Sequence, residues 1–545
     1  MRLDEPPLKE DHVASEQLSP TGLVDRRRFL GGAAVAAAAA VAWRPSLSSA
    51  QTGLLAGDDN PFTLGVGSGD PLPTAVVLWT RLAPDPLNGG GMPNTDVSVA
   101  WVIARDEGLS DVVTSGTATA PAAFAHSVHV DATGLEPDTW YWYQFSADGF
   151  DSPVGRTRTA PAPGSSPSSL RFGFASCQNY GSGYFTAHAN LANEDLDVCF
   201  HLGDYIYEGA GGGVRSVPGG EATTLAGYRN RYALYRSDPN LRAVHQRFPW
   251  MVTWDDHEVE NNYAGDISED GITGAAFLTR RAEAYQAWWE HQAVRMPPPV
   301  AADLPIYRNF TWGSLASLFM LDTRQYRSDQ ACGGATLSPL CAEALDPART
   351  MLGAAQEQWI ANGVTSSGAR WNVIAQAVVM AYTPLVGQFN LDQWDGYPAA
   401  RDRMLELFGR PEVRNPLVLT GDIHASGAGR LLADFDNPDT SAVVGHELVG
   451  TSISSTFPDG LDDLFNQVTS GLPWADYANA SERGYVTVEL TEEVGTANWR
   501  VVDTTTAETS GVRTDFTWEI PVDDPGGAPS TGSTAPVAAT PRFTG

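Results

Sequence analysis

The sequence predicts a two-part fold, in which an all-β domain precedes a larger α/β domain. Short β-rich runs separated by Gly, Pro, Asn and Asp fill residues 61–160, and a Pro/Ser-rich linker follows at 161–168. From 169 to 519, apolar runs alternate with helical stretches such as RRAEAYQAWWEHQ. With 545 residues, 42% of them hydrophobic, the chain can bury a core in both parts.

The first domain is expected to be an immunoglobulin-like or fibronectin-III-like β-sandwich. Its strand candidates include AVVLWTRL, VSVAWVIA and WYWYQF, spaced as in such sandwiches. The segment GLEPDTWYWYQF, which contains Tyr141, resembles the tyrosine corner of these domains. We expect no chemistry of its own from this domain.

Both ends of the chain have compositions unlike a folded domain. In residues 1–50, Arg26 and Arg27 precede an Ala-rich stretch that ends in small residues, which predicts a twin-arginine signal peptide, export by the twin-arginine translocase, and a secreted or cell-wall-associated protein. A membrane-spanning helix is the alternative, but the apolar run is short. Residues 520–545 are rich in Pro, Gly, Ser and Thr, which predicts a disordered tail.

Charge and cysteine content exclude several classes of function. The formal net charge is −31, so we expect no nucleic-acid-binding patch. Lys9 is the only lysine, which leaves the mature chain without a P-loop lysine or a Schiff base. Cys332 and Cys341 predict a disulfide of an exported protein, whereas Cys177 and Cys199 lie in apolar runs.

Five apolar runs of the α/β region end on residues that can bind metals. These residues are Cys177, Asp204, Asp255 with Asp256, Asp322, and Asp422. Because ligands of α/β sheets gather at the carboxyl ends of strands, the spacing predicts that these side chains converge. Buried carboxylates without counter-charges cost several kcal/mol per ion, so we expect bound metal cations among them.

Further donors stand beside these strand ends. Tyr207 follows Asp204 by three residues, and His424 follows Asp422 by two. A mixture of carboxylate, imidazole, phenol and thiol suits a hard divalent or trivalent ion better than tetrahedral zinc. Taken alone, Cys177 would more often be an inert buried thiol, and Tyr207 could belong to the core.

Together the motifs ASCQNY, GDYIYE, WDDHE, LDTRQYR and GDIHAS closely resemble those of the alkaline phosphatase D family of exported metallophosphoesterases. The resemblance implies the metallophosphoesterase fold, with two mixed sheets flanked by helices and a metal centre at the strand ends. It also implies a centre that contains Fe³⁺ and Ca²⁺.

The resemblance assigns metal-binding roles to six residues. It implies that iron is bound by Cys177, Asp204, Tyr207 and His424. It implies that Asp204 bridges to a calcium site that Asp256 and Asp422 complete.

Two further residues are candidates for catalysis. His257 could protonate the leaving group or hydrogen-bond the phosphoryl oxygen, and Arg324 is expected to face the phosphate. The sequence leaves open whether four more residues join the site: Asp255, Asp322, Asn261 and Asn262.

The expected function is hydrolysis of phosphate mono- and diesters by metal-bound hydroxide. Expected substrates are small phosphate esters, phospholipids or teichoic-type polymers. A phosphodiesterase or phospholipase D-type activity is the alternative main role, and a non-catalytic surface binding module is a further one. A serine hydrolase is disfavoured because the chain contains no G-x-S-x-G motif.

Overall fold

The structure is a computed structural model that describes residues 60–522. These residues belong to one compact unit. The predicted signal peptide and almost all of the predicted tail lie outside the described residues, so both stay predictions. None of the helices in the described part is long and apolar enough to cross a membrane.

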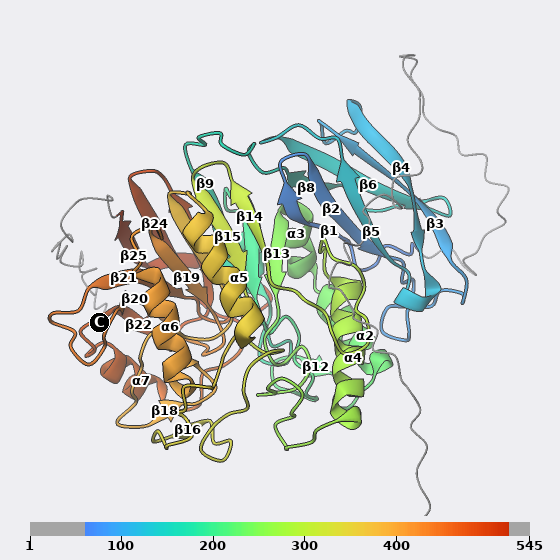
Figure 1. Ribbon diagram of the computed structural model, residues 1–545. Helices are drawn as coiled ribbons and strands as arrows, with labels where there is room; N and C mark the ends of the chain where they lie inside the picture. The colour runs from blue at the N-terminus through green and yellow to red at the C-terminus, as the bar shows by residue number, and fades with distance from the viewer. Residues whose placement is uncertain (1–59, 523–545) are drawn as a thin grey trace, which may run out of the picture. The chain divides into compact units, whose positions relative to one another are not determined.

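Two large sheets form the body of the molecule (Figure 1). The first has nine strands, in the order β25 (Val512–Pro521), β24 (Val494–Val502), β23 (Gly484–Leu490), β9 (Leu170–Ala175), β10 (Val198–Leu202), β13 (Pro249–Thr253), β1 (Val66–Leu72), β2 (Ala75–Arg81) and β5 (Ser127–Thr133). The second has seven strands, in the order β14 (Arg308–Trp312), β15 (Ala316–Met320), β17 (Trp371–Ala375), β19 (Pro416–Thr420), β21 (Val443–Val449), β20 (Ser426–Leu432) and β22 (Ala475–Asn479).

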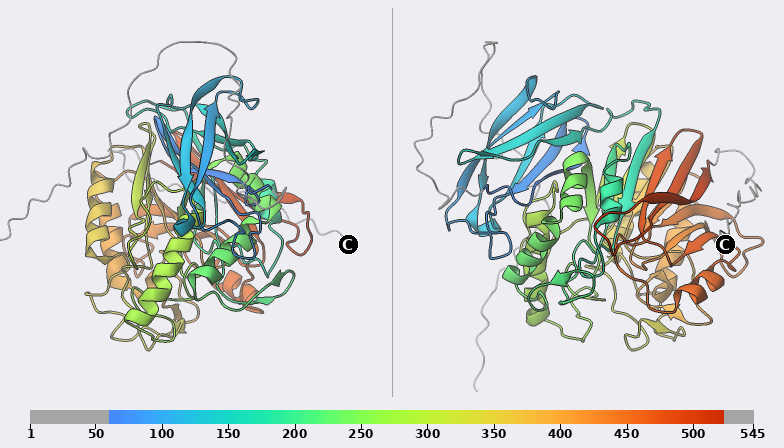
Figure 2. Two further views of the ribbon diagram at one scale, coloured as in Figure 1. Left: turned by 90° about the vertical axis from the view of Figure 1, so that its right-hand side faces the viewer. Right: turned by 180° about the vertical axis from the view of Figure 1, so that it is seen from behind.

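The two sheets pack face to face, and helices cover their outer faces (Figure 2). Apolar side chains fill the contacts between these layers. The outer face of β9, β10 and β13 packs against α2 (Leu225–Arg236), α3 (Pro239–Arg247) and α4 (Ala275–His291), with α1 (Thr186–Leu191) beside them. The outer face of β15, β17 and β19 packs against α5 (Gly353–Ser366) and α6 (Pro398–Phe408). These strands are buried on both faces, which explains why they read as continuous apolar runs.

Residues 61–160 form two packed layers. One layer contains β4 (Val112–Ala120), β3 (Val97–Ala104), β6 (Trp140–Ala147), β7 (Phe150–Asp151) and β8 (Gly155–Arg158), and the other is formed by β1, β2 and β5. The Tyr141 hydroxyl accepts a hydrogen bond of 2.8 Å from the Glu136 backbone N–H. Because β1 pairs in parallel with β13, the nine-stranded sheet continues across the predicted domain boundary.

The remaining elements are short and lie in connections. They are α7 (Asp462–Thr469), the pair β11 (Gly211–Gly212) and β12 (Ser216–Val217), the pair β16 (Leu337–Ser338) and β18 (Phe389–Asn390), and the 3₁₀ turns Ala122–Phe124 and Trp394–Gly396. The predicted disulfide between Cys332 and Cys341 is confirmed, and the loop that it closes contains β16.

The five predicted strands that end on metal-competent residues are confirmed as β9, β10, β13, β15 and β19. Within the first sheet, β9, β10 and β13 run parallel, and within the second, β15, β17, β19 and β21 do. Parallel strands bring their carboxyl ends to the same edge of a sheet, so each sheet presents its strand-end residues on one side.

Candidate metal centre

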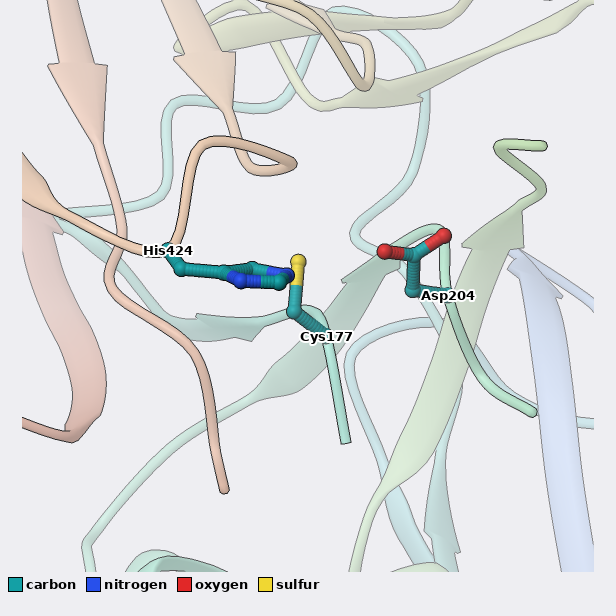
Figure 3. A group of neighbouring side chains, drawn as sticks. All are labelled: Cys177, Asp204 and His424. Atoms are coloured by element: carbon teal, nitrogen blue, oxygen red, sulfur yellow. The ribbon is translucent and has the colours of Figure 1, made fainter. Parts of the chain in front are cut away.

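The strand ends of the two sheets bring three predicted iron ligands together. Ligand atoms of Cys177, Asp204 and His424 all lie within 4.8 Å of one another. The thiol and the imidazole lie next to each other with the Asp204 carboxylate facing them (Figure 3). Tyr207 completes the group, because its hydroxyl donates to Asp204 Oδ2 at 2.9 Å and lies 3.0 Å from His424 Nε2.

A left-handed backbone conformation recurs at these ligands. The φ angle is 57° at Cys177, 54° at Asp204, 61° at Asp422 and 56° at His424. Such φ values cost about 1–3 kcal/mol for residues other than glycine, and they persist where the surrounding structure enforces them. Gly203 also has a positive φ. The position requires glycine, because a Cβ there would lie 2.4 Å from the Cβ of Asp255.

Carboxylates form a second group around Asp204. Oxygens of Asp204, Asp255, Asp256 and Asp422 lie within 4.8 Å of one another, and all but Asp422 are buried. Asp255, whose orientation the sequence left open, therefore points into the group. Asp204 Oδ1 and Asp255 Oδ2 are buried and have no hydrogen-bond partner among the described residues.

The electrostatics of the cluster favour bound cations. Burial, followed by the charges of Asp256 and Asp255, raises the pKa of Asp204 well above its usual value, although His257 opposes the shift. Burial and the neighbouring Asp256 raise the pKa of Asp422 to about 7. A cation would restore the charged forms and give the partnerless Asp204 oxygen a ligand, so the residues present fit a metal centre.

The thiol of Cys177 fits the same interpretation. Burial and the nearby carboxylates of Asp204 and Asp422 raise its pKa well above the usual value for cysteine. A metal ion deprotonates a coordinating thiol outright, so this position is suited to a metal ligand and unsuited to a free nucleophile. Cys199 lies inside β10 and is buried, in keeping with an inert core thiol.

Arg324 lies against the carboxylate cluster. Its side chain is fully buried, its Nε donates to Asp255, and its two terminal nitrogens donate to Asp392 at 2.8 and 2.7 Å. Its expected role of facing the phosphate stays a prediction. In this structure the carboxylates of Asp255 and Asp392 engage the guanidinium, and Arg324 neutralises that side of the cluster.

Asp322 also stays outside the centre, although its strand ends on the same side of its sheet. Its Oδ1 accepts from the indole of Trp254 at 3.1 Å and from the backbone N–H of Arg324 at 3.0 Å. Asn262 reaches the site through its backbone, because its N–H donates to Asp256 Oδ2 at 2.7 Å. The backbone N–H of Asn261 donates to Glu208 Oε1.

His257 borders the ligands and is partly accessible to solvent. Its side chain is 20% exposed, its Nδ1 lies 2.7 Å from Glu208 Oε2, and its ring centroid lies 4.1 Å from that of Tyr207. Burial alone would lower the pKa of His257, but the carboxylates of Glu208, Asp256 and Asp204 raise it well above the usual value.

The sequence analysis missed several supporting residues. Glu208 directly follows Tyr207, so its place in the same motif was a usable signal. Ser455, which donates to the Tyr207 hydroxyl at 2.8 Å, and Gln393, which donates to Asp422, lie in loops far from every motif. Asp392 lies in such a loop too, and nothing in its sequence neighbourhood signals its pairing with Arg324.

Comparison with known proteins places this centre in a class, the metal-dependent phosphoric ester hydrolases. The family model described as PhoD-like phosphatase matches residues 172–499, and that of the PhoD-like phosphatase N-terminal domain matches residues 48–161. The chain belongs to the PhoD-like phosphatase family, as the resemblance of the motifs predicted.

Two similar proteins support this assignment. Alkaline phosphatase D of Bacillus subtilis (strain 168) is 46% identical over 507 residues, which cover 90% of this chain and 86% of that protein. A solved structure entitled "Structure of PhoD" matches with a TM-score of 0.83 and 47% identity, covering 86% of this chain and 91% of that one. The protein is therefore a PhoD-like phosphoesterase whose mainly β fold matches that structure.

Proposed function

We propose that the protein hydrolyses phosphate mono- and diesters at a centre containing Fe³⁺ and Ca²⁺. The observation that carries the proposal is the convergence of Cys177, Tyr207 and His424 on Asp204, whose Oδ1 is buried without a partner. Cys177, Asp204, Tyr207 and His424 would hold iron, and Asp204, Asp256 and Asp422 would hold calcium through oxygen atoms alone.

The metal ions would supply activated water and neutralise charge that develops on the phosphoryl group. The chain's own contribution is to fix the ligands. Ser455 donates to the Tyr207 hydroxyl, and the backbone carbonyl of Thr456 lies 2.8 Å from His424 Nδ1. With Nδ1 holding the proton in that bond, Nε2 of His424 is left as the ligand atom.

His257 would protonate the leaving oxygen. Glu208 binds its Nδ1, which orients the ring and favours the imidazolium form. The Nε2–H is then available for donation. Arg324 would act as a positioning residue, because its NH2 group lies 3.6 Å from Asp256 and 3.9 Å from Asp422, both proposed calcium ligands.

The finer description of the fold is also a proposal. The two packed sheets with helices on their outer faces support a metallophosphoesterase fold for residues 169–519. The two β layers and the hydrogen bond of the Tyr141 hydroxyl support an immunoglobulin-like or fibronectin-III-like domain at 61–160.

Export by the twin-arginine translocase, and a secreted or cell-wall-associated location, follow from residues 1–50. The Cys332–Cys341 disulfide supports this proposal, since disulfides persist in oxidising compartments. Phospholipids or teichoic-type polymers would then be accessible substrates. The alternative is a diesterase or phospholipase D-type activity as the main role.

Two measurements test the function. Metal analysis of protein exported by its own host should find iron together with calcium, and zinc alone would contradict the ligand assignment. Turnover of p-nitrophenyl phosphate, bis-p-nitrophenyl phosphate and phosphatidylcholine by the same preparation should show hydrolysis of both monoester and diester. A metal-loaded protein inactive on all three would favour the non-catalytic binding module.

A further inference from the structure

A cavity of about 250 Å³ lies apart from the metal centre, and none of the candidate metal ligands lines it. Its walls come from the end of β2, from the Gly89–Asn94 loop, from the turn before β5 and from the first half of α2. The cavity therefore lies where residues of the N-terminal sandwich meet a helix of the larger region.

An arginine with no carboxylate of its own forms one wall. Arg81 is 1% exposed, its Nε donates to the carbonyl of Ala125 at 2.9 Å, and its NH1 lies 2.7 Å from His291 Nε2. His291 is neutral there, because its Nδ1 donates to the carbonyl of Ala287 while burial and Arg81 lower its pKa well below the usual value. Both partners of Arg81 are thus uncharged.

The third nitrogen of Arg81 lies beside the loop that lines the cavity. A Cβ built on Gly90 would lie 3.2 Å from Arg81 NH2. Gly90 and Arg81 both line the cavity, and no hydrogen bond of the described residues engages this nitrogen. The NH2 group of Arg81 can therefore donate a hydrogen bond to a ligand in the cavity.

Positive charge exceeds negative charge around this cavity. Arg229 also lines it and is neutralised by Glu290, whose side chain is fully buried. The charge of Glu290 also acts on Arg81. The two arginines that line the cavity thus have one carboxylate between them.

The end of a helix adds to this imbalance. Ala226, in the first turn of the twelve-residue helix α2, lines the cavity. The first turn of a helix carries partial positive charge. Burying cations without an anion costs several kcal/mol each, and the protein as a whole is strongly acidic, so the local excess of positive charge is unusual.

We propose that this cavity binds a small oxyanion, a carboxylate-, sulfate- or phosphate-type group, through Arg81 NH2. Such an anion would neutralise the charge that Glu290 leaves uncompensated. The bound anion would link the Gly89–Asn94 loop to α2. One link exists already, because the Gly89 N–H donates to Oδ1 of Asn230, a residue of α2, at 3.3 Å.

The test uses sulfate and selenate as probes on the metal-loaded full chain. Phosphate is avoided because it would also bind the metal centre as reaction product. Crystals soaked in selenate should show a selenium anomalous peak within hydrogen-bonding distance of Arg81. Sulfate should raise the melting temperature by about 2 °C beyond its general effect through surface exclusion.

A pair of variants separates specific binding from the general salt effect. Met92 lines the cavity and is half-buried, so Met92→Glu places a tethered carboxylate in it, while Met92→Gln adds the same bulk without charge. We expect Met92→Glu to melt higher than Met92→Gln and to lose both the specific sulfate shift and the selenate peak. Ala243→Glu and Ala243→Gln, at an exposed position of α3, should respond alike to sulfate.

Three results would overturn the proposal. One is the absence of a selenium peak in the cavity of the wild type. Another is Met92→Glu melting below Met92→Gln. The third is a Met92→Glu variant that keeps both the selenium peak and the full rise of melting temperature with sulfate. That result would show an adventitious ion only.

Discussion

Two buried aspartates of the same cluster differ in where their counter-charge comes from. Asp392 is held by Arg324 through both oxygens and by Arg327 at 2.7 Å, and these arginines lower its pKa despite burial. Asp204 has no arginine partner, its Oδ1 has no partner among the described residues, and burial raises its pKa well above the usual value. The chain supplies arginines for Asp392 and none for Asp204, which fits the proposal that Asp204 binds metal ions.

Asp256 lies between these extremes. Its pKa is lowered despite burial, because Arg324 lies 3.6 Å from Oδ2 and His257 adds a second positive charge. Its Oδ1 and Oδ2 also accept from the backbone N–H groups of His257 and Asn262. Asp256 is thus the carboxylate that stays ionised before any metal binds, which suits an initial contact for a cation.

The largest expected effect comes from removing the carboxylate that lacks a protein partner. Asp204→Asn should lower kcat/KM by about 1,000-fold or more, because both proposed metal sites lose a ligand. Steady-state kinetics and metal analysis of the same sample check this expectation. Asp195→Asn, at an 80% exposed position, is the control and should change neither. Retention of full activity by Asp204→Asn would contradict the bridging role.

Removing the charge of Asp392, the aspartate paired with arginines, should mainly lower the stability of the fold. Asp392→Asn leaves Arg327 buried without its charge partner and removes one of the partners of Arg324, so the free energy of unfolding should fall by about 3–5 kcal/mol. Denaturant unfolding of the metal-loaded protein measures this change. Glu357→Gln, which breaks the more exposed pair with Arg403, should cost less than about 1 kcal/mol. If the two variants lost the same free energy of unfolding, the buried pairing of Asp392 with arginine would contribute no more to stability than an exposed ion pair, which would contradict the contrast drawn between Asp392 and Asp204.

The stability of the protein freed of metal by a chelator should depend on pH through Asp422, another carboxylate of the cluster. The pKa of Asp422 rises from an ordinary 3.8 to about 7 in the metal-free folded protein. Between these pH values the folded protein holds a proton on Asp422 that the unfolded chain has released. Its contribution to stability is complete below pH 3.8 and is lost as the pH rises through about 7. The loss should be about 4 kcal/mol, and Asp422→Asn should abolish it.

Denaturant titrations of wild type and Asp422→Asn at pH 4 and pH 8, both with chelator, give this difference directly. Added metal should stabilise the wild type more at pH 8 than at pH 5, because metal binding requires the ionised carboxylate. An identical pH profile for the two chelated proteins would show that Asp422 titrates normally.

The smallest expected effect concerns the proton donor. His257→Gln should lower kcat/KM about 100-fold for an alkyl phosphate, which needs its leaving oxygen protonated, and less than about 10-fold for p-nitrophenyl phosphate. Glu208→Gln should show the same split more weakly, because it removes the partner that favours the imidazolium. Equal slowing of both substrates would exclude the acid role of His257.

The sequence predicted the part of the site that short motifs encode. Cys177, Asp204, Asp256 and Asp422 each follow an apolar run, and buried parallel strands bring such run ends together. Tyr207 and His424 are separated by a few residues from a strand end, so their positions followed from the same reasoning.

The remainder depends on contacts between distant segments. The role expected for Arg324, facing the phosphate, stays a prediction. No local pattern indicated that Asp392, which is 68 residues away and in no motif, pairs with it inside the protein. The pairing of β1 with β13 joins strands almost two hundred residues apart, so local patterns could not reveal the continuous nine-stranded sheet. Asp255 and Asp256 are adjacent, and alternation alone could not show that both carboxylates turn toward the centre.

Anomalous diffraction across the iron absorption edge, on crystals of protein exported by its own host, tests the central claim most directly. We expect one iron peak within bonding distance of Cys177 Sγ, Tyr207 Oη, His424 Nε2 and an Asp204 oxygen. The absence of iron from that position, with these four side chains lying apart from any metal, would contradict it.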